Sequence, residues 1–329
     1  MKRPLRIVAA ALGVILIASA ALIFWQTRSP SFEPYASLTL PVAPGAPNGA
    51  IRARFFGTTT LLIDDGETSL MVDGFFSRPP FTAVLFGKIA PDEARIDRAL
   101  QRGQVKKVDA LLVAHSHYDH ALDSAVVARK TGALLVGSVS TANIGRGASV
   151  GEDRIRIVKN GDSIRFGAFE VVFYETPHSP RPAFPGEIEQ PLRAPAKSSD
   201  YKLGTTYSFL LRHPRGNVLI VPSANYLPGR FDGIGANVVF LGIGTLGKQT
   251  EEFMRTYWNE VVKKTGATLV VPIHWDDFSR SLDEPPRPLP YLADDMSRSM
   301  AVLERLARAD GVTIRFAPLF EPFVCVGTN

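Results

Sequence analysis

Three imidazoles and one carboxylate fall within six consecutive residues of this chain, His115-Ser116-His117-Tyr118-Asp119-His120. The run 108–114 just before them is almost continuously apolar, which predicts a strand buried on both faces. Such a strand fixes where the following loop begins, so alternate residues of the loop can converge. Neutral imidazole and carboxylate are the ligands that zinc prefers where cysteine is absent. The segment therefore predicts a metal site at the end of a buried strand.

The remaining histidines lie in distant segments of the chain, which has six in all. His178 follows the predicted strand 169–174, and His274 follows the predicted strand 268–271. Because α/β domains collect ligands at strand ends, we expect both side chains to join the His-rich segment. His213 lies instead in a hairpin turn with Pro and Gly and is interpreted as a surface residue.

Cysteine content and charge exclude several other kinds of site. Cys325 is the one cysteine of the chain, which rules out an intrachain disulfide, a cysteine-based zinc finger and a CxxC redox motif. The formal net charge is +5, but beyond the N-terminus no dense Lys/Arg cluster with interleaved aromatics occurs, so no nucleic-acid partner is expected. A mildly basic surface suits an anionic substrate or membrane face, and scattered solvated charges are the simpler interpretation.

The N-terminus carries a targeting signal. Lys2, Arg3 and Arg6 precede an uncharged apolar run, Ile7–Trp25. Its length approaches the roughly 20 residues that a helix needs to cross a hydrocarbon core, so we expect a hydrophobic helix that anchors the chain in a membrane. Positive residues tend to stay on the cytoplasmic side, which places the rest of the chain in the periplasm or otherwise outside the cytoplasm. Ala18-Ser19-Ala20 offers the alternative of a cleaved signal peptide and secretion to the same side.

Composition divides the chain into three parts. Residues 1–25 form the predicted signal anchor or signal peptide. Residues 26–50 are rich in proline, which favours extended, non-helical chain and predicts a tether. The catalytic domain is expected over residues 51–329, a length that suits one large α/β domain.

Strand signals dominate the predicted domain, and helices separate some of the strands. We therefore expect a mixed α/β domain of packed sheets with helices outside. Residues 74–104 and 179–204 resist assignment, and the second segment directly follows His178, where it is placed to cover the site. The expected strands are 52–56, 59–63, 69–72, 108–114, 133–136, 154–158, 163–166, 169–174, 207–211, 217–221, 238–241 and 268–271, and the expected helices are 121–130, 250–264 and 294–308.

The H-x-H-x-D-H segment, with later single histidines at strand ends, resembles the metallo-β-lactamase superfamily. The segments 56–60 (Phe-Gly-Thr-Thr-Thr) and 71–74 (Met-Val-Asp-Gly) also resemble that family's first hairpin and its strand-end Asp. The segment Pro272-Ile273-His274-Trp275 looks more like the branch that contains ascorbate-phosphate lactonases and the phospholipases D that act on N-acylethanolamine phospholipids. The resemblance covers roughly residues 51–320.

The resemblance implies a four-layer αββα sandwich with one or two metal ions at one edge. Asp73 is implied to steady the His-rich loop, the usual task of a carboxylate behind metal ligands. The ligands implied for a first metal are His115, His117 and His178, and those implied for a second are Asp119, His120 and His274.

One departure from the family pattern bears on the second metal. The family usually has Gly-Asp after the strand that corresponds to 217–221, and that Asp bridges both metals. Here Ala224 stands where the Asp would be, between Ser223 and Asn225. Neither neighbour is a carboxylate, so we expect weaker metal binding, above all at the second site. Three histidines with an open fourth position can support hydrolysis alone.

The expected chemistry is hydrolysis. A bound zinc ion, or another divalent metal, lowers the pKa of its water from about 15.7 to about 7 and stabilises the oxyanion formed by hydroxide attack. Asp119 and His178 are expected to be essential for catalysis, Asp119 by orienting the nucleophile or accepting its proton. The predicted function is a membrane-tethered, zinc-dependent hydrolase of an ester, lactone or phosphodiester, acting on a small-molecule or lipid substrate.

Other functions stay open. A degenerate, non-catalytic member of the fold would keep a structural metal and bind a ligand or partner, and Ala224 is the best argument for it. A flavo-di-iron type of oxidoreductase is disfavoured, because its usual acidic ligands are missing and no flavin-binding module follows. β-Lactamase activity has no specific support in the sequence.

Overall fold

Two seven-stranded mixed sheets form the centre of the computed structural model, which describes residues 12, 16, 18–22, 24–45 and 50–327. The first sheet has the order β14-β1-β2-β3-β4-β5-β6 and the second β13-β12-β11-β10-β9-β8-β7. The first contains β1 (Ile51–Phe55), β2 (Leu61–Asp64), β3 (Ser69–Val72), β4 (Ala110–Leu112), β5 (Leu134–Gly137), β6 (Ile155–Ile157) and β14 (Pro322–Val326). The second contains β7 (Ser163–Phe166), β8 (Phe169–Glu175), β9 (Tyr207–Arg212), β10 (Val218–Val221), β11 (Val238–Gly242), β12 (Leu269–Ile273) and β13 (Thr313–Ile314).

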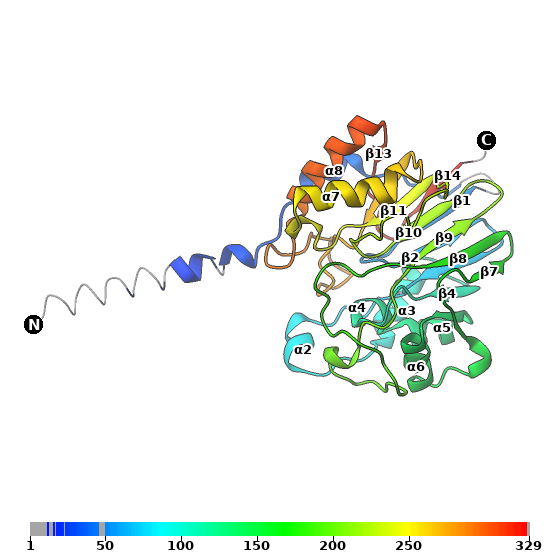
Figure 1. The fold of residues 1–329 in the computed structure, drawn as a ribbon. Helices are drawn as coiled ribbons and strands as arrows, with labels where there is room; N and C mark the ends of the chain where they lie inside the picture. Colours follow the sequence, from blue (N-terminus) through cyan, green and yellow to red (C-terminus); the bar gives the residue numbers. More distant parts are fainter. Residues whose placement is uncertain (1–11, 13–15, 17, 23, 46–49, 328–329) are drawn as a thin grey trace, which may run out of the picture.

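Helices cover the outer faces of both sheets, as Figure 1 shows. Those beside the first sheet are α2 (Phe81–Phe86), α3 (Glu93–Arg102), α4 (Tyr118–Ala121), α5 (Ser124–Thr131) and α6 (Val139–Gly147). Those beside the second are α7 (Glu251–Trp258), a π-helical continuation (Asn259–Lys263) and α8 (Met296–Asp310). Short 3-10 helices span Glu33–Leu38, Glu152–Arg154, Ser198–Asp200 and Leu246–Lys248. The expected α/β class of packed sheets with outer helices is confirmed.

The central strands of the first sheet, β2 to β5, are buried on both faces. In β4, Ala110 and Leu112 pack into the core between the sheets, whereas Leu111 packs into the core beneath the helices. Alternate side chains of a strand point to opposite faces, so a strand covered on both sides needs apolar residues throughout. Each fully buried Leu contributes roughly 1.5–3 kcal/mol to folding. The run before His115 is therefore continuously apolar because its strand is covered on both faces, as predicted.

The expected strands are confirmed to within a few residues, but the helices less so. The expected helix 121–130 is two helices, α4 and α5, with a break between them. Thr250 caps α7 by accepting a hydrogen bond from the Phe253 amide, which places the start of the helix at the expected residue. Helices α2 and α3 lie in the segment 74–104, to which the sequence analysis assigned no secondary structure. The 14th strand pairs with β1 and brings the end of the described chain to the edge of the first sheet.

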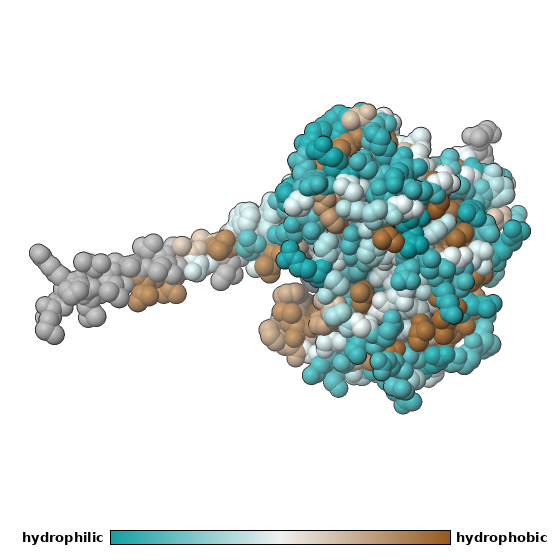
Figure 2. Space-filling view, viewed as in Figure 1, coloured by the Kyte–Doolittle hydropathy of each residue, from teal (hydrophilic) through white to brown (hydrophobic). Residues whose placement is uncertain are grey.

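The N-terminal predictions are partly outside the described residues, because 1–11, 13–15, 17 and 23 are not described. Of the expected hydrophobic helix, positions 12, 16, 18–22 and 24–26 are helical. Within the described part of the chain, no helix has the length and apolarity needed to cross a membrane. Figure 2 shows hydrophobic surface on this segment and on α2, which projects from the same side of the domain.

The expectation of non-helical chain over 26–50 is wrong at Gln26, which continues the N-terminal helix, and at one further segment. A 3-10 helix spans Glu33–Leu38, with Pro34 in its first turn, where a missing N–H leaves no hydrogen bond unmade. Phe32 just before it stacks on Trp275, with 4.6 Å between ring centroids, and the Leu40 amide donates to the Phe316 carbonyl. This segment therefore lies against the domain.

Candidate metal centre

Strand ends from both sheets meet at one edge of the molecule, and all six predicted metal ligands lie there. β4 leads to His115, β8 leads to His178 and β12 leads to His274. Helix α4 begins after His117 and carries the last two ligands of the His-rich segment. The six side chains form two groups, and within each group the potential ligand atoms all lie within 4.8 Å of one another. The first group is His115, His117 and His178, and the second is Asp119, His120 and His274.

The first group consists of imidazoles only. Ring centroids lie 4.9 Å apart for His115 and His117, 4.8 Å for His115 and His178, and 5.0 Å for His117 and His178. His117 Nε2 is 2.7 Å from the Ala183 carbonyl oxygen, and His178 Nδ1 is 2.9 Å from the Ser179 carbonyl oxygen. These nitrogens must be protonated to donate there, which leaves Nδ1 of His117 and Nε2 of His178 as lone-pair donors.

His115 supplies the test of whether a metal fits. Its side chain is buried, and neither ring nitrogen has a hydrogen-bond partner among the described residues. A buried polar group left without a partner costs roughly 1–3 kcal/mol, so native structures seldom leave both nitrogens of one ring unsatisfied. A metal ion between the three rings would satisfy one of them. The residues present therefore fit a metal.

The second group adds a carboxylate. His120 Nε2 lies 3.2 Å from His274 Nε2, and Asp119 Oδ2 lies 3.7 Å and 3.5 Å from these two nitrogens. The rings of His115 and His120 are 3.8 Å apart by centroid, so the two groups adjoin. The residues present would therefore fit two neighbouring metal ions, one for each group.

Asp73 occupies the position implied by the family resemblance. Its Oδ2 lies 2.7 Å from His120 Nδ1, and its Oδ1 accepts a hydrogen bond of 2.7 Å from the Ala114 amide. Thr59 donates to the same carboxylate through its hydroxyl. Because His120 Nδ1 donates to Asp73, its Nε2 is the nitrogen that points into the second group. Asp73 thus fixes both the tautomer of one ligand and the end of the strand before His115.

Burial and neighbouring charges together set the protonation of the ligands. It holds the pKa of His115 well below its usual value, and it lowers the pKa of His117 and that of His178, the latter to about 4. These imidazoles are therefore neutral at neutral pH, which is the form that binds metal. Burial raises the pKa of Asp119, but the nearby His120 and His274 outweigh it, so this carboxyl has a lowered pKa and is ionised.

A buried ion pair behind His274 was missed by the sequence analysis. Arg78 Nη1 lies 2.8 Å from Asp276 Oδ2, and the two side chains are 2% and 3% exposed. Asp276 Oδ1 also accepts a 2.7 Å hydrogen bond from the Thr58 amide, and the Thr58 carbonyl accepts from the His274 amide at 2.5 Å. His274 and Thr58 both have left-handed backbone, with φ of 60° and 53°, which needs such support. The one local signal was an acid two residues after His274.

Ala224 leaves the bridging position without a carboxylate. Its side chain is buried, and its amide donates to Ser179 Oγ at 3.0 Å. Asn225 donates through Nδ2 to the His178 carbonyl at 2.6 Å, so it supports a ligand's backbone. Ser223 lines the adjoining cavity. Among the described residues, Asp119 is the one acid in either ligand group.

A cavity of about 390 Å³ opens over the ligands His117, Asp119, His178 and His274. The segment 180–184, which follows His178, forms one of its walls, as its position in the sequence led us to expect. Tyr118 also lines this cavity, whereas Trp275 is buried among aromatic rings.

His213 stands apart from the metal centre. Its side chain is only 5% exposed and its Nε2 lies 3.4 Å from Asp65 Oδ2, so the expected separation from the site holds but the expected surface position is wrong. Phe169 covers the ring, with 4.7 Å between centroids.

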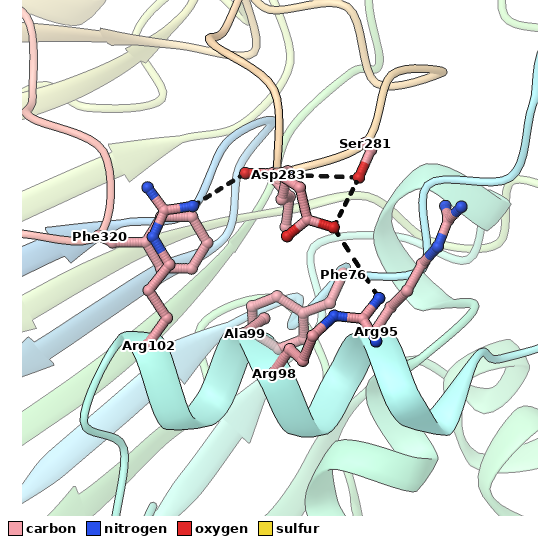
Figure 3. A pocket seen from close by; sticks show the side chains of 9 residues that line it. Phe76, Arg95, Arg98, Ala99, Arg102, Ser281, Asp283 and Phe320 are labelled. Atoms are coloured by element: carbon pink, nitrogen blue, oxygen red, sulfur yellow. Dashed lines mark hydrogen bonds and ion pairs between the residues drawn. The ribbon is translucent and has the colours of Figure 1, made fainter.

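A smaller hollow of about 20 Å³ lies between α3 and the loop that follows His274 (Figure 3). Its arginines are already engaged: Arg98 lies 3.9 Å from Asp283, and Arg102 donates to the Leu282 carbonyl at 3.0 Å while it covers the Phe320 ring. These contacts tie the loop to α3. None of the six metal ligands lines this hollow.

Comparison with known proteins places the site within a recognised domain type. A family profile described as a beta-lactamase superfamily domain matches residues 70–275, which include all six ligands and Asp73. A "UPF0173 metal-dependent hydrolase" from Heliobacterium modesticaldum is 28% identical over 93 residues, covering 28% of this chain and 32% of that protein. A relative of the same name from Rubrobacter xylanophilus is 28% identical over 124 residues, covering 37% of this chain and 44% of its own. The matched part is thus less than half of these relatives.

Solved structures share the fold at low sequence identity. Igni18, a metallo hydrolase from the archaeon Ignicoccus hospitalis, superposes with a TM-score of 0.52 at 14% identity, covering 83% of this chain and 98% of that one. CmlA, a diiron beta-hydroxylase from Streptomyces venezuelae, has a TM-score of 0.51 at 15% identity, covering 84% of this chain and 54% of that one. The arrangement of sheets and helices is therefore one that other metal proteins use.

Proposed function

The chain belongs to the β-lactamase superfamily, and from that membership and its six converging ligands we propose that it is a metal-dependent hydrolase. The observation that carries the proposal is His115, a buried imidazole with no hydrogen-bond partner at either nitrogen among the described residues. Five further ligand-type side chains surround it in two adjoining groups. Curated relatives that match part of the chain are named metal-dependent hydrolases, which supports the proposal.

The proposed metal is zinc, one or two ions, held by the two ligand groups. A bound zinc ion would lower the pKa of water from about 15.7 to about 7 and stabilise a developing oxyanion. Asp119 is ionised and lies at the cavity, where it can orient a water molecule and accept its proton. Asp73 keeps His120 in the tautomer that presents Nε2. CmlA, which shares the fold, is a diiron protein, and metal analysis of this chain distinguishes zinc from iron.

The proposed substrate is an ester, a lactone or a phosphodiester, in keeping with the branch that the Pro272–Trp275 segment resembles. Most of the cavity wall is apolar, including Val84, Leu85 and Phe278, which favours a substrate with a hydrophobic portion. We also propose that the apolar run 7–25 tethers the domain to a membrane, outside the cytoplasm.

A non-catalytic binding protein is the second candidate, and Ala224 favours it. A methyl group stands where a bridging carboxylate would hold both metals, so the second group has fewer charges to retain an ion. The first group alone has three histidines and a cavity above it. That arrangement matches catalytic zinc sites, which keep three protein ligands and one open position.

Activity of the full-length chain distinguishes the two candidates. The purified protein, supplied with zinc, is tested on 4-nitrophenyl butyrate, δ-valerolactone and bis(4-nitrophenyl) phosphate. His178→Ala is expected to reduce hydrolysis at least about 100-fold, since it removes a metal ligand. His213→Ala is the matched control, because its ring is also covered but lies outside the site. Equal rates for His178→Ala and wild type on every cleaved substrate would refute the hydrolase.

A further inference from the structure

Helix α2 exposes large apolar side chains. Phe81 is 54% exposed, Leu85 54% and Phe86 86%, and none of its six residues is buried. Soluble proteins rarely gather such side chains at one place unless a partner or a membrane covers them. Figure 2 shows the resulting hydrophobic patch at the lower left of the domain, over α2.

This patch continues into the cavity over the metal centre. Leu85 belongs both to the exposed surface of α2 and to the cavity wall. Phe184, which is 38% exposed, lines the cavity from the segment 180–184. On a third side, Leu289 and Ala293 line the cavity while Leu292 between them is 63% exposed. We call the exposed set Phe81, Leu85, Phe86, Phe184 and Leu292 the apolar rim.

The N-terminal apolar helix ends beside the apolar rim. Trp25 stacks on Tyr291, with 4.8 Å between ring centroids, and the Leu292 amide donates to the Gln26 carbonyl at 2.8 Å. The Tyr291 amide likewise donates to the Arg28 carbonyl at 2.8 Å. The helix therefore leaves the domain on the side of α2, as Figure 1 shows. Its described large apolar side chains are also exposed, namely Leu12, Leu16, Leu22, Phe24 and Trp25.

Two cationic side chains lie near the apolar rim. Lys88 follows α2 and Arg181 lines the cavity, and neither side chain has an ion pair or hydrogen bond within the part of the chain that the structure describes. Anionic lipid head groups attract such cations near a bilayer surface, where each strengthens binding roughly fivefold, or about 1 kcal/mol. Apolar side chains flanked by cations are the composition of surfaces that lie in the bilayer interface.

We propose that the apolar rim docks on a lipid bilayer, so that the cavity opens onto the membrane and takes a bilayer lipid as substrate. The docking stands on the exposed surface alone, whereas the lipid substrate rests on the proposed hydrolase function. The bilayer is favoured over a second protein chain because the apolar rim is continuous with an apolar helix that points the same way. A lipid can then present its polar group to the metal centre while its chains remain among Leu85, Phe184 and Leu289.

Nitroxide accessibility on the full-length chain tests the docking without reference to activity. Cys325 is buried and can be replaced by Ser, so that Phe86→Cys carries the one spin label. Val139→Cys is the matched control, since Val139 is 50% exposed on α6, away from the N-terminal segment. Both proteins are reconstituted in vesicles of four parts dioleoylphosphatidylcholine to one part dioleoylphosphatidylglycerol.

The proposal predicts that the label at position 86 collides several-fold more with oxygen, and less with a nickel chelate, than the label at position 139. Equal accessibility of the two labels would overturn it. Dipolar broadening at position 86 would also overturn it, because that signal means that a second chain, rather than lipid, covers α2.

Two ester substrates test the second part of the proposal, that the substrate comes from the bilayer. Phe81→Asp combined with Phe86→Asp leaves the cavity wall intact, since neither residue lines it. This variant should cleave 4-nitrophenyl palmitate in vesicles about tenfold more slowly than wild type, and soluble 4-nitrophenyl butyrate at the wild-type rate. Unchanged cleavage of the vesicle substrate would refute delivery from the bilayer. If wild type cleaves neither ester nor any other substrate, the hydrolase fails, and the nitroxide result still decides the docking.

Discussion

Arg78 and Asp276 form a buried ion pair whose second carboxylate oxygen holds the Thr58 amide, and Thr58 in turn accepts the hydrogen bond of the His274 amide. A charge buried this deeply is stable only when paired, so the two residues depend on each other. They lie far apart in sequence, and their contact joins the loop after β3 to the loop after β12. The pair therefore fixes the backbone of one metal ligand in its left-handed conformation.

Removing one partner of the Arg78–Asp276 pair should destabilise the protein. Asp276→Ala leaves the Arg78 guanidinium buried without its partner, which is expected to lower the free energy of unfolding by about 3–5 kcal/mol. The measurement is urea unfolding of the metal-free protein. Asp283→Ala is the matched control, because its exposed pair with Arg98, 3.9 Å apart, should contribute about 1 kcal/mol or less. Equal losses in the two variants would contradict the structural role of the buried pair.

Asp73 should control metal affinity through His120. Asp73→Asn weakens the acceptor for His120 Nδ1 and allows the wrong tautomer, so we expect metal affinity to fall about 10–100-fold. Competition titration against a chromophoric chelator measures it. Asp65→Asn provides the comparison, since this carboxylate lies near His213 and away from the ligands. If Asp73→Asn and Asp65→Asn bind zinc equally well, Asp73 does not orient a ligand.

Restoring the bridging carboxylate should strengthen the binding of a second metal ion. Ala224→Asp adds a negative ligand-type group at the position where the family usually has one, which is expected to raise zinc occupancy toward two ions per chain. Isothermal titration with zinc gives the stoichiometry. Ala224→Asn has nearly the same shape without the charge, so an identical response from both variants would show that position 224 does not reach the metals.

Acid should destabilise the metal-free protein through its neutral histidines. Burial lowers the pKa of His178 from about 6.5 in the unfolded chain to about 4, so the folded state binds fewer protons between these values. The stabilisation is present above pH 6.5 and is lost as pH falls toward 4, by at most about 3 kcal/mol for this residue. Urea unfolding between pH 4 and 6.5 should show the free energy of unfolding rising with pH. His178→Gln should reduce the slope of this rise. An unchanged slope in that variant would show that residues other than His178 cause the acid sensitivity.

Much of the fold was predictable because its signals are local. The apolar run before His115 reports a strand covered on both faces, and single histidines after two other predicted strands lie at the ends of β8 and β12. Alternation and turn residues located nearly all of the strands for the same reason. The ligand set followed from where the strands end, and the structure brings all six together.

The rest depends on contacts that no local pattern records. Helix α3 buries only Ile96, Ala99 and Leu100 among charged residues, and its clearest signal is the cap in which Asp92 accepts from the Arg95 amide. The apolar residues of α2 face outward and give no amphipathic period. The Arg78–Asp276 pair arises only when two distant loops meet, so tertiary structure alone reveals it.

The most direct test of the account is the metal content of the full-length chain, measured by mass spectrometry after dialysis against zinc and then against metal-free buffer. The account predicts one to two zinc ions per wild-type chain, and a loss of at least one ion in His115→Ala but none in His213→Ala. A wild-type chain that retains no metal under these conditions would contradict the metal centre and the hydrolase built on it.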